Sequence, residues 1–254
     1  MPPADRKSAS LAAALRLRWR EARRRYGFWR ALRRLIAEAV DFLRDSTPAR
    51  RRSRFGDVDF DWDHRVDTTA ATVGTRARLA AVLGGSPYQP TEPALFREML
   101  DSMALDWPQF NFTDLGSGKG RALLMAADYP FRRIVGVEVV PELHAIACEN
   151  IRQYRGPAQQ CFAIESLCGD AREYEFPPEP LLLYLFNPLP EPGLQRVIAN
   201  LERSLLAHPR RAYVLYHNPQ LEPVLAASPA LRKLGGTHQY SIFVSSGVIL
   251  QVSS

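Results

Sequence analysis

The sequence predicts an α/β fold: a mostly parallel sheet with helices on both faces, an antiparallel C-terminal hairpin, and a basic helical arm at the N-terminus. Apolar strands alternate with amphipathic helices from residue 94 onwards. The strands are apolar throughout rather than at alternate positions, which is typical of a parallel sheet buried on both faces. We therefore expect an arm and linker over residues 1–54, a preceding segment over 55–93 and an α/β domain over 94–254.

The composition favours a globular protein. The chain has 254 residues, of which 46% are hydrophobic and 24% charged, enough for one domain and an appendage. No run of 18 apolar residues could span a membrane, and the polar first ten residues do not resemble a signal peptide. We expect a cytoplasmic protein. Its three cysteines (Cys148, Cys161, Cys168) and its histidines lack metal-ligand spacing, so we expect no metal site.

Positive charge is concentrated in the arm. Residues 1–54 contain 16 Lys and Arg but only 5 Asp and Glu, whereas the whole chain has a net charge of +6. Apolar residues between Leu15 and Leu43 recur every three or four positions, which predicts one or two amphipathic helices with an arginine face, Gly27 being the place of a break or bend. Three interpretations remain open: packing on the body or on a second copy, binding to an anionic membrane surface as a peripheral protein, or binding to nucleic acid.

The body is predicted element by element. We expect helices over residues 94–105, 121–128, 141–154 and 195–206, and strands over 110–115, 133–139, 181–186 and 212–216, with a further strand within 161–169. Two strands over 239–244 and 248–252, joined by Ser-Ser-Gly, are expected to form the closing hairpin. Residues 55–93 alternate acidic and aromatic residues and then become rich in glycine and proline, and no element is assigned to them.

A glycine-rich loop, Asp114-Leu-Gly116-Ser117-Gly118-Lys119-Gly120, follows the first strand and precedes a helix. Glycines allow sharp turns and close approach of a ligand to backbone amides. The spacing is neither that of a P-loop nor GxGxxG. The carboxylate of Asp114 would repel a pyrophosphate but suits an ammonium or a sulfonium. We predict that Asp114, Gly116, Ser117 and Gly118 bind a cofactor, although a tight turn alone would need the same glycines; Lys119 is expected to be exposed.

Two further acids follow strands. Glu138 ends the next strand, where a carboxylate can accept both hydroxyls of a ribose, and Asp170 follows the third, where it could accept from an adenine amine. Alternatively, Glu138 is a solvated strand end and Asp170 caps the turn at Ala171-Arg172. Carboxylates at three strand ends with a glycine turn match a positively charged adenosine ligand. S-adenosylmethionine fits that description.

Asp114–Gly120, Glu138 and Asp170 resemble motifs I, II and III of class I S-adenosylmethionine-dependent methyltransferases, and the resemblance covers about residues 88–219. It implies a Rossmann-like seven-stranded sheet in the order 3-2-1-4-5-7-6 with strand 7 antiparallel. Within that superfamily the sequence is similar to non-SET protein lysine methyltransferases, and more so to uncharacterised bacterial members with a Phe-Asn-Pro segment. Tyr88 and Thr91 lie where this fold often places a cofactor lid, although the neighbouring prolines also fit plain turns.

The residues after the fourth predicted strand, 181–186, indicate which kind of group accepts the methyl. Methyl transfer is an in-line displacement that needs a neutral, well-positioned nucleophile. Asn187, at the end of the apolar strand, could accept from an N–H donor without adding charge, so it is our candidate catalytic residue; it could also be only a turn residue before Pro188. His217 could act as a base or be structural. We expect methylation of a protein amine, a lysine, with a small-molecule acceptor or an inactive fold that binds through the arm as alternatives.

Overall fold

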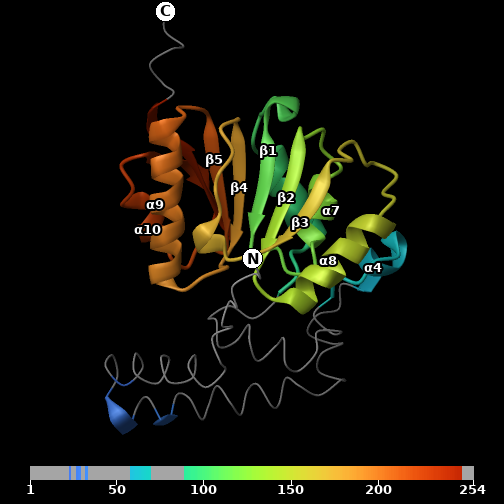
Figure 1. The fold of residues 1–254 in the computed structure, drawn as a ribbon, viewed down its shortest axis with the longest axis horizontal. Helices are drawn as coiled ribbons and strands as arrows, with labels where there is room; N and C mark the ends of the chain where they lie inside the picture. The colour runs from blue at the N-terminus through green and yellow to red at the C-terminus, as the bar shows by residue number, and fades with distance from the viewer. Residues whose placement is uncertain (1–22, 24–26, 30–31, 34–57, 70–88, 248–254) are drawn as a thin grey trace, which may run out of the picture.

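The computed structural model describes residues 23, 27–29, 32–33, 58–69 and 89–247 (Figure 1). The predicted arm over 1–54 falls outside the described residues except for those few positions. The same holds for residues 70–88, which include Tyr88, and for the predicted strand over 248–252. No helix among the described ranges is long and apolar enough to cross a membrane.

The described residues form a seven-stranded sheet in the order β3-β2-β1-β4-β5-β7-β6. Its strands are β1 (Asn111–Leu115), β2 (Arg133–Glu138), β3 (Ile164–Cys168), β4 (Leu181–Phe186), β5 (Ala212–His217), β6 (Leu231–Gly236) and β7 (Tyr240–Ser245). The strands β1 to β5 are parallel to one another, and β7 is antiparallel to both β5 and β6. The predicted fold class and strand order are therefore confirmed.

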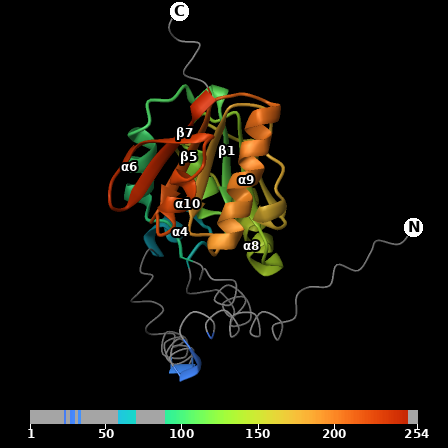
Figure 2. The ribbon, with the colours of Figure 1, turned by 90° about the vertical axis from the view of Figure 1, so that its left-hand side faces the viewer.

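Helices cover both faces of this sheet. On one face lie α6 (Pro93–Asp101), α7 (Arg121–Ala126) and α8 (Pro141–Gln153); on the other lie α9 (Glu191–Ala207) and α10 (Glu222–Ala226). Figure 2 shows α6 and α9 on opposite sides of the strands. Short 3-10 turns, η2 (Trp107–Gln109) and η3 (Ala171–Glu173), precede β1 and follow β3. Two buried clusters result, one on each face of the sheet.

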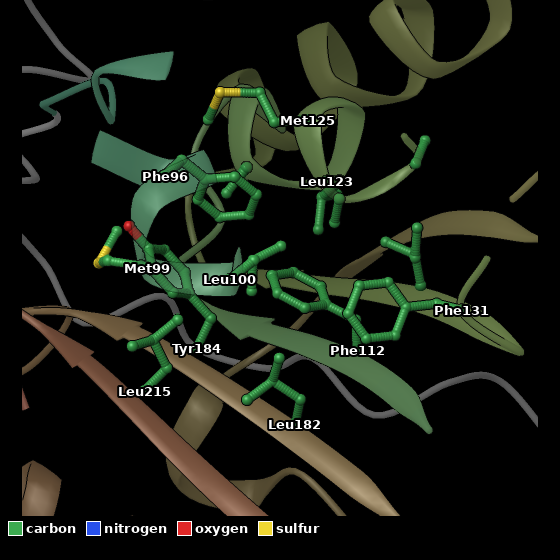
Figure 3. Packing of buried hydrophobic residues seen from close by; sticks show 14 of the residues in the cluster. Phe96, Met99, Leu100, Phe112, Leu123, Met125, Phe131, Leu182, Tyr184 and Leu215 are labelled. Carbon is green, nitrogen blue, oxygen red and sulfur yellow. The ribbon is translucent and has the colours of Figure 1, made fainter. Parts of the chain in front are cut away.

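The core beneath α6 is aromatic. Phe96, on α6, packs against Phe112 and Tyr184 of the sheet, with ring centroids 6.1 and 5.5 Å apart (Figure 3). The helix begins where the carboxylate of Glu92 accepts from the backbone N–H groups of Ala94 and Leu95. It ends at Asp101 instead of residue 105. The helix α6 is thereby packed onto β1 and β4, the two central strands of the parallel part of the sheet.

The closing hairpin differs from the prediction. The expected strand over 239–244 is present as β7, and its hairpin partner is β6, which the sequence did not predict; the expected strand over 248–252 lies outside the described residues. Sequence periodicity missed β6 because only Leu231 of that strand is buried; the following five residues are exposed, and the register shifts between Lys233 and Gly235. An exposed edge strand carries no apolar pattern to detect.

Residues 58–69, for which the sequence predicted no element, begin with the helix α4 (Val58–His64). The helix lies beside α8 (Figure 1), where the His64 ring stacks between Phe60 and Tyr154 with centroids 4.3 and 5.4 Å away. The backbone N–H of Asp67 donates to the side-chain oxygen of Asn150 on α8, 2.8 Å away. This segment is therefore packed onto the α/β domain.

Candidate cofactor and acceptor site

The glycine loop leaves β1 in a conformation that side chains rarely adopt. Gly116, Gly118 and Gly120 have φ angles of +84°, +56° and +85°. A Cβ on Gly116 would lie 2.7 Å from the Cβ of Pro188, so this position also lacks space for a side chain. The N–H of Gly116 donates to the carbonyl of Val137, 2.8 Å away, which ties the loop to β2.

The loop is also bonded to the acid at the end of β2. The N–H of Gly118 donates to Oε2 of Glu138, and the N–H of Val140 donates to Oε1, both at 2.8 Å. Glu138 is 5% exposed, and burial raises the pKa of its carboxyl group, although these amide bonds oppose the rise. Each carboxylate oxygen still has capacity for another donor, such as a ribose hydroxyl. The structure thus brings together Gly118 and Glu138, two residues that were each predicted to bind the cofactor.

Asp114 lies in the same buried region. It is 4% exposed. Burial, followed by the negative charge of Glu138, raises the pKa of Asp114 to about 8. Two carboxyl groups that repel each other in a buried place are stabilised by any cation that enters between them.

Ser117 faces β2. Its hydroxyl is buried and has no hydrogen-bond partner among the described residues. A Cβ on Gly136 would lie 2.6 Å from the Ser117 oxygen, so glycine at position 136 leaves room for the serine. A buried hydroxyl without a hydrogen-bond partner costs free energy of folding, and a ligand that hydrogen-bonds to it would recover that cost. The structure places Ser117 within the predicted loop but shows no contact to Glu138.

Asp170 follows β3 and caps η3. Its carboxylate accepts from the backbone N–H of Arg172 at 2.9 Å and forms an ion pair with the Arg172 guanidinium. Hydrogen bonding to Arg172 lowers the pKa of Asp170. Asp170 therefore caps the turn at Ala171-Arg172, which is one of the two roles expected for it. Contact with an adenine amine remains a prediction.

Val139 was not singled out from the sequence. It follows Glu138 directly and is 63% exposed, unusual for an apolar residue next to a buried acid. An exposed apolar side chain at this place gives a ligand beside Glu138 an apolar surface to pack on. The sequence signal for it is the pair of apolar residues, Val139 and Val140, that stands between Glu138 and the start of α8.

Thr91 belongs to a buried hydrogen-bonded chain. Its hydroxyl lies 2.8 Å from the Tyr184 hydroxyl, which in turn lies 2.8 Å from Nδ1 of His217. Burial lowers the pKa of His217 to about 4, so its imidazole is neutral at pH 7. The Phe186 ring stacks on this imidazole at 3.9 Å. In the described structure Thr91 thus contacts Tyr184, and its predicted cofactor contact stays untested.

Asn187 joins the ends of two strands. It and Asn218 adopt positive φ angles of +44° and +49° after β4 and β5. The Asn187 amide nitrogen donates to the Asn218 carbonyl at 2.7 Å, and its amide oxygen accepts from the Tyr216 hydroxyl at 2.8 Å. The side chain therefore joins the ends of β4 and β5, and its amide oxygen retains one lone pair for a further donor.

Lys119 is not exposed, contrary to the sequence-based expectation. Its exposed fraction is 0%, and its Nζ donates to Oδ1 of Asp67 at 2.7 Å. The sequence separation of 52 residues explains the error. A charge that looks solvated locally acquires its partner only through tertiary packing.

A cavity of about 520 Å³ lies on the α9 side of the sheet. Its lining includes Asn111 and Arg133, which begin β1 and β2, and Tyr174 and Glu179, which lie between β3 and β4. The glycine loop and Glu138 are at the opposite ends of these strands. The cavity is therefore separate from the candidate cofactor site.

Comparisons with known proteins give partial structural similarities. No family model matches the sequence, and no curated protein matches it. An RNA methyltransferase from Salinibacter ruber in complex with S-adenosyl-L-homocysteine is 22% identical, with 62% of this chain and 92% of that chain covered and a TM-score of 0.41. A predicted N6-adenine-specific DNA methylase from Listeria monocytogenes is 15% identical (62% and 52% covered; TM-score 0.45). A ribosomal protein L11 methylase from Lactobacillus delbrueckii is 14% identical (60% and 76% covered; TM-score 0.39).

Proposed function

We propose that this protein is an S-adenosylmethionine-dependent methyltransferase. The observation that carries the proposal is the pair of buried carboxyl groups, Asp114 and Glu138, beside a loop whose Gly118 amide holds Glu138 in place. Such a pair favours a ligand that combines hydroxyl donors with positive charge. A phosphate-bearing nucleotide would be repelled by the Glu138 carboxylate, and it would not favour ionisation of Asp114.

Each part of the site has an assignable role. Glu138 would accept the ribose hydroxyls, Asp114 would balance the ligand's positive charge, and Asp170 would accept from the adenine amine. Gly116 and Gly118 keep the backbone open to the ligand, and Val139 offers an apolar surface to the base. When bound, the cofactor supplies an electrophilic methyl group on a sulfonium. The chain itself has to bind, orient and exclude water.

We further infer that the acceptor is a neutral nitrogen, in the first place a protein lysine. The side chains at the ends of β4 and β5, Asn187, His217 and Asn218, carry no charge at pH 7 because the pKa of His217 is about 4. A carboxylate there would hold an amine protonated, whereas a neutral rim near a bound cation lowers the pKa of an entering amine.

The basic arm over residues 1–54 is proposed to bind an anionic surface in the cell, a membrane or nucleic acid. Its excess of 11 positive charges supports this. Such binding would bring a cytoplasmic enzyme close to its acceptor. It would weaken as the salt concentration rises, because surface charge interactions are screened.

The acceptor class can be identified by transfer of a tritiated methyl group. The purified full chain is incubated with labelled S-adenosylmethionine and a lysate of cells that lack the protein, and label is measured in protein, nucleic acid and small molecules. Label in protein that survives nuclease and elutes as methyl-lysine supports the proposal. Label in nucleic acid or in small molecules would replace the lysine with that acceptor. No label in any fraction would contradict transferase activity.

A further inference from the structure

Two cations next to the candidate site are buried. Lys119, between Gly118 and Gly120, is 0% exposed, and Arg121, at the start of α7, is 2% exposed. Removing such groups from water costs several kcal/mol unless partners compensate. Both receive partners from residues 58–69.

Lys119 is bonded to the end of this segment. Its Nζ donates to Oδ1 of Asp67 at 2.7 Å and to the carbonyl of Thr69 at 2.9 Å. Burial lowers the pKa of Lys119, and the Asp67 carboxylate opposes that fall. The ion pair therefore keeps the charge on a lysine that burial alone would tend to neutralise.

Arg121 is bonded to the same segment. Its Nε donates to the Thr68 hydroxyl at 2.6 Å, and its terminal nitrogen lies 3.1 Å from Oδ1 of Asp61. The other oxygen of Asp61 accepts from the backbone N–H groups of Thr68 and Thr69 at 2.7 and 2.9 Å. The guanidinium also lies over the Phe60 ring, 4.9 Å from its centroid. Residues 58–69 are thus folded around one end of the glycine loop.

Asn150 completes the attachment from α8. Its side-chain nitrogen donates to the carbonyls of both Asp67 and Lys119, at 2.8 and 2.9 Å, and its oxygen accepts from the N–H of Asp67. At 2% exposed, it is buried between the two segments. The backbone of the loop and the backbone of residue 67 are therefore held at a fixed separation.

We propose that residues 58–69 are a clamp that holds the glycine loop in its cofactor-binding conformation, with Lys119 and Asp67 as positioning residues. This inference rests on the proposed function. A loop with three left-handed glycines has little intrinsic preference for one conformation, so tertiary contacts must select it. The clamp fixes Lys119 directly after Gly118, whose N–H holds Glu138.

The clamp has a measurable consequence for affinity. If the loop populates its binding conformation only a tenth of the time, the apparent dissociation constant rises about tenfold. We therefore expect Lys119→Met and Asp67→Asn each to weaken S-adenosylmethionine binding about tenfold. Because both remove the same ion pair, the double variant should bind no more than slightly worse than either single variant.

The test is calorimetric titration of S-adenosylmethionine into the full chain and these variants, at a temperature where all are folded by circular dichroism. Lys233→Met is the matched control, because it removes the ion pair of Lys233 with Glu222, on the hairpin and α10. Leu205→Ala is a second control, which destabilises the core under α9. Both controls should bind with unchanged affinity.

Hydrogen exchange distinguishes the clamp from general destabilisation. In Lys119→Met and Asp67→Asn the amides of Gly118 and Gly120 should exchange faster than in the wild type, whereas in Leu205→Ala they should not. If Lys119→Met does not fold, the affinity and hydrogen exchange of Asp67→Asn alone test the clamp. Wild-type binding with unchanged affinity in the clamp variants would overturn the clamp and leave the proposed function standing. Absence of wild-type binding would overturn both.

Discussion

The backbone N–H of Gly118 donates to Oε2 of Glu138 across 2.8 Å, which joins the loop after β1 to the end of β2. The two residues are 20 positions apart in the sequence, and each was assigned to cofactor binding on separate grounds. Their contact means that the loop and the acid form one rigid unit. A ligand that uses the acid must therefore pass close to the glycine backbone.

Affinity for S-adenosylmethionine should rise with pH between about 6 and 7.5. With a pKa of about 8, Asp114 holds a proton in the free protein at these pH values, and a cationic ligand favours its carboxylate. Binding must then release a proton, so alkaline conditions favour it. Measurements stay below pH 7.5 because the ligand's own α-amino group loses its charge near 8.

Calorimetry in buffers of different ionisation enthalpy measures this proton release directly. Asp114→Asn is the control: its binding should be weaker and should show no release. A wild-type affinity that is constant over this range would mean that Asp114 does not respond to the ligand.

Gly116→Ala should abolish cofactor binding. The added Cβ would lie 2.7 Å from the Pro188 Cβ, and the φ angle of +84° costs an L-residue about 1–2 kcal/mol in addition. The loop would have to move away from the end of β4. Gly235→Ala, where an added Cβ meets no atom within 4 Å, is the matched control and should bind normally. Equal affinities in the two variants would show that Gly116 does not shape the site.

Tyr184→Phe should lower the free energy of unfolding by about 1–3 kcal/mol, because it leaves the buried Thr91 hydroxyl and the His217 imidazole without their shared partner. Chemical denaturation measures this change. In a double-mutant cycle with Thr91→Val, the two losses should not add, since they remove the same bond. Additive losses would show that the chain of hydrogen bonds does not act as a unit.

Removal of residues 1–54 should leave cofactor affinity unchanged, since the clamp over 58–69 is retained. It should weaken binding to anionic vesicles or to nucleic acid, measured by co-sedimentation and gel shift at low salt. A truncated chain that no longer binds S-adenosylmethionine would place the arm within the cofactor site.

The sequence predicts the sheet well where burial imposes a pattern. The residues of β4, Leu181–Phe186, are apolar without interruption, and the predicted bounds equal the observed ones. The sequence did not predict β6, because five of its six residues are exposed and carry no apolar pattern. Helix α9 begins at Glu191, four residues before its predicted start. The prediction began too late because prolines in the first turn of a helix resemble the prolines of a loop.

The candidate site could be predicted only in part. Motif spacing assigned Gly118 and Glu138 to one cofactor site, and the structure shows them in contact because strand ends in a parallel sheet share one edge. It could not place Lys119, whose partner Asp67 lies in a segment without an apolar pattern. Motif spacing also could not show that Asp170 forms an ion pair with Arg172, because that contact depends on the side-chain conformations of the two residues.

The central claim is tested most directly by calorimetric titration of S-adenosylmethionine into the full chain and into Glu138→Gln. The substitution keeps the shape of the side chain but removes the charge that accepts hydroxyl donors, and a hydrogen bond to a charged group contributes about 1.5–3 kcal/mol. We predict saturable one-to-one binding to the wild type and an affinity at least about tenfold weaker in the variant. Equal affinity would remove Glu138 from the site, and a wild type that binds no S-adenosylmethionine would contradict the account as a whole.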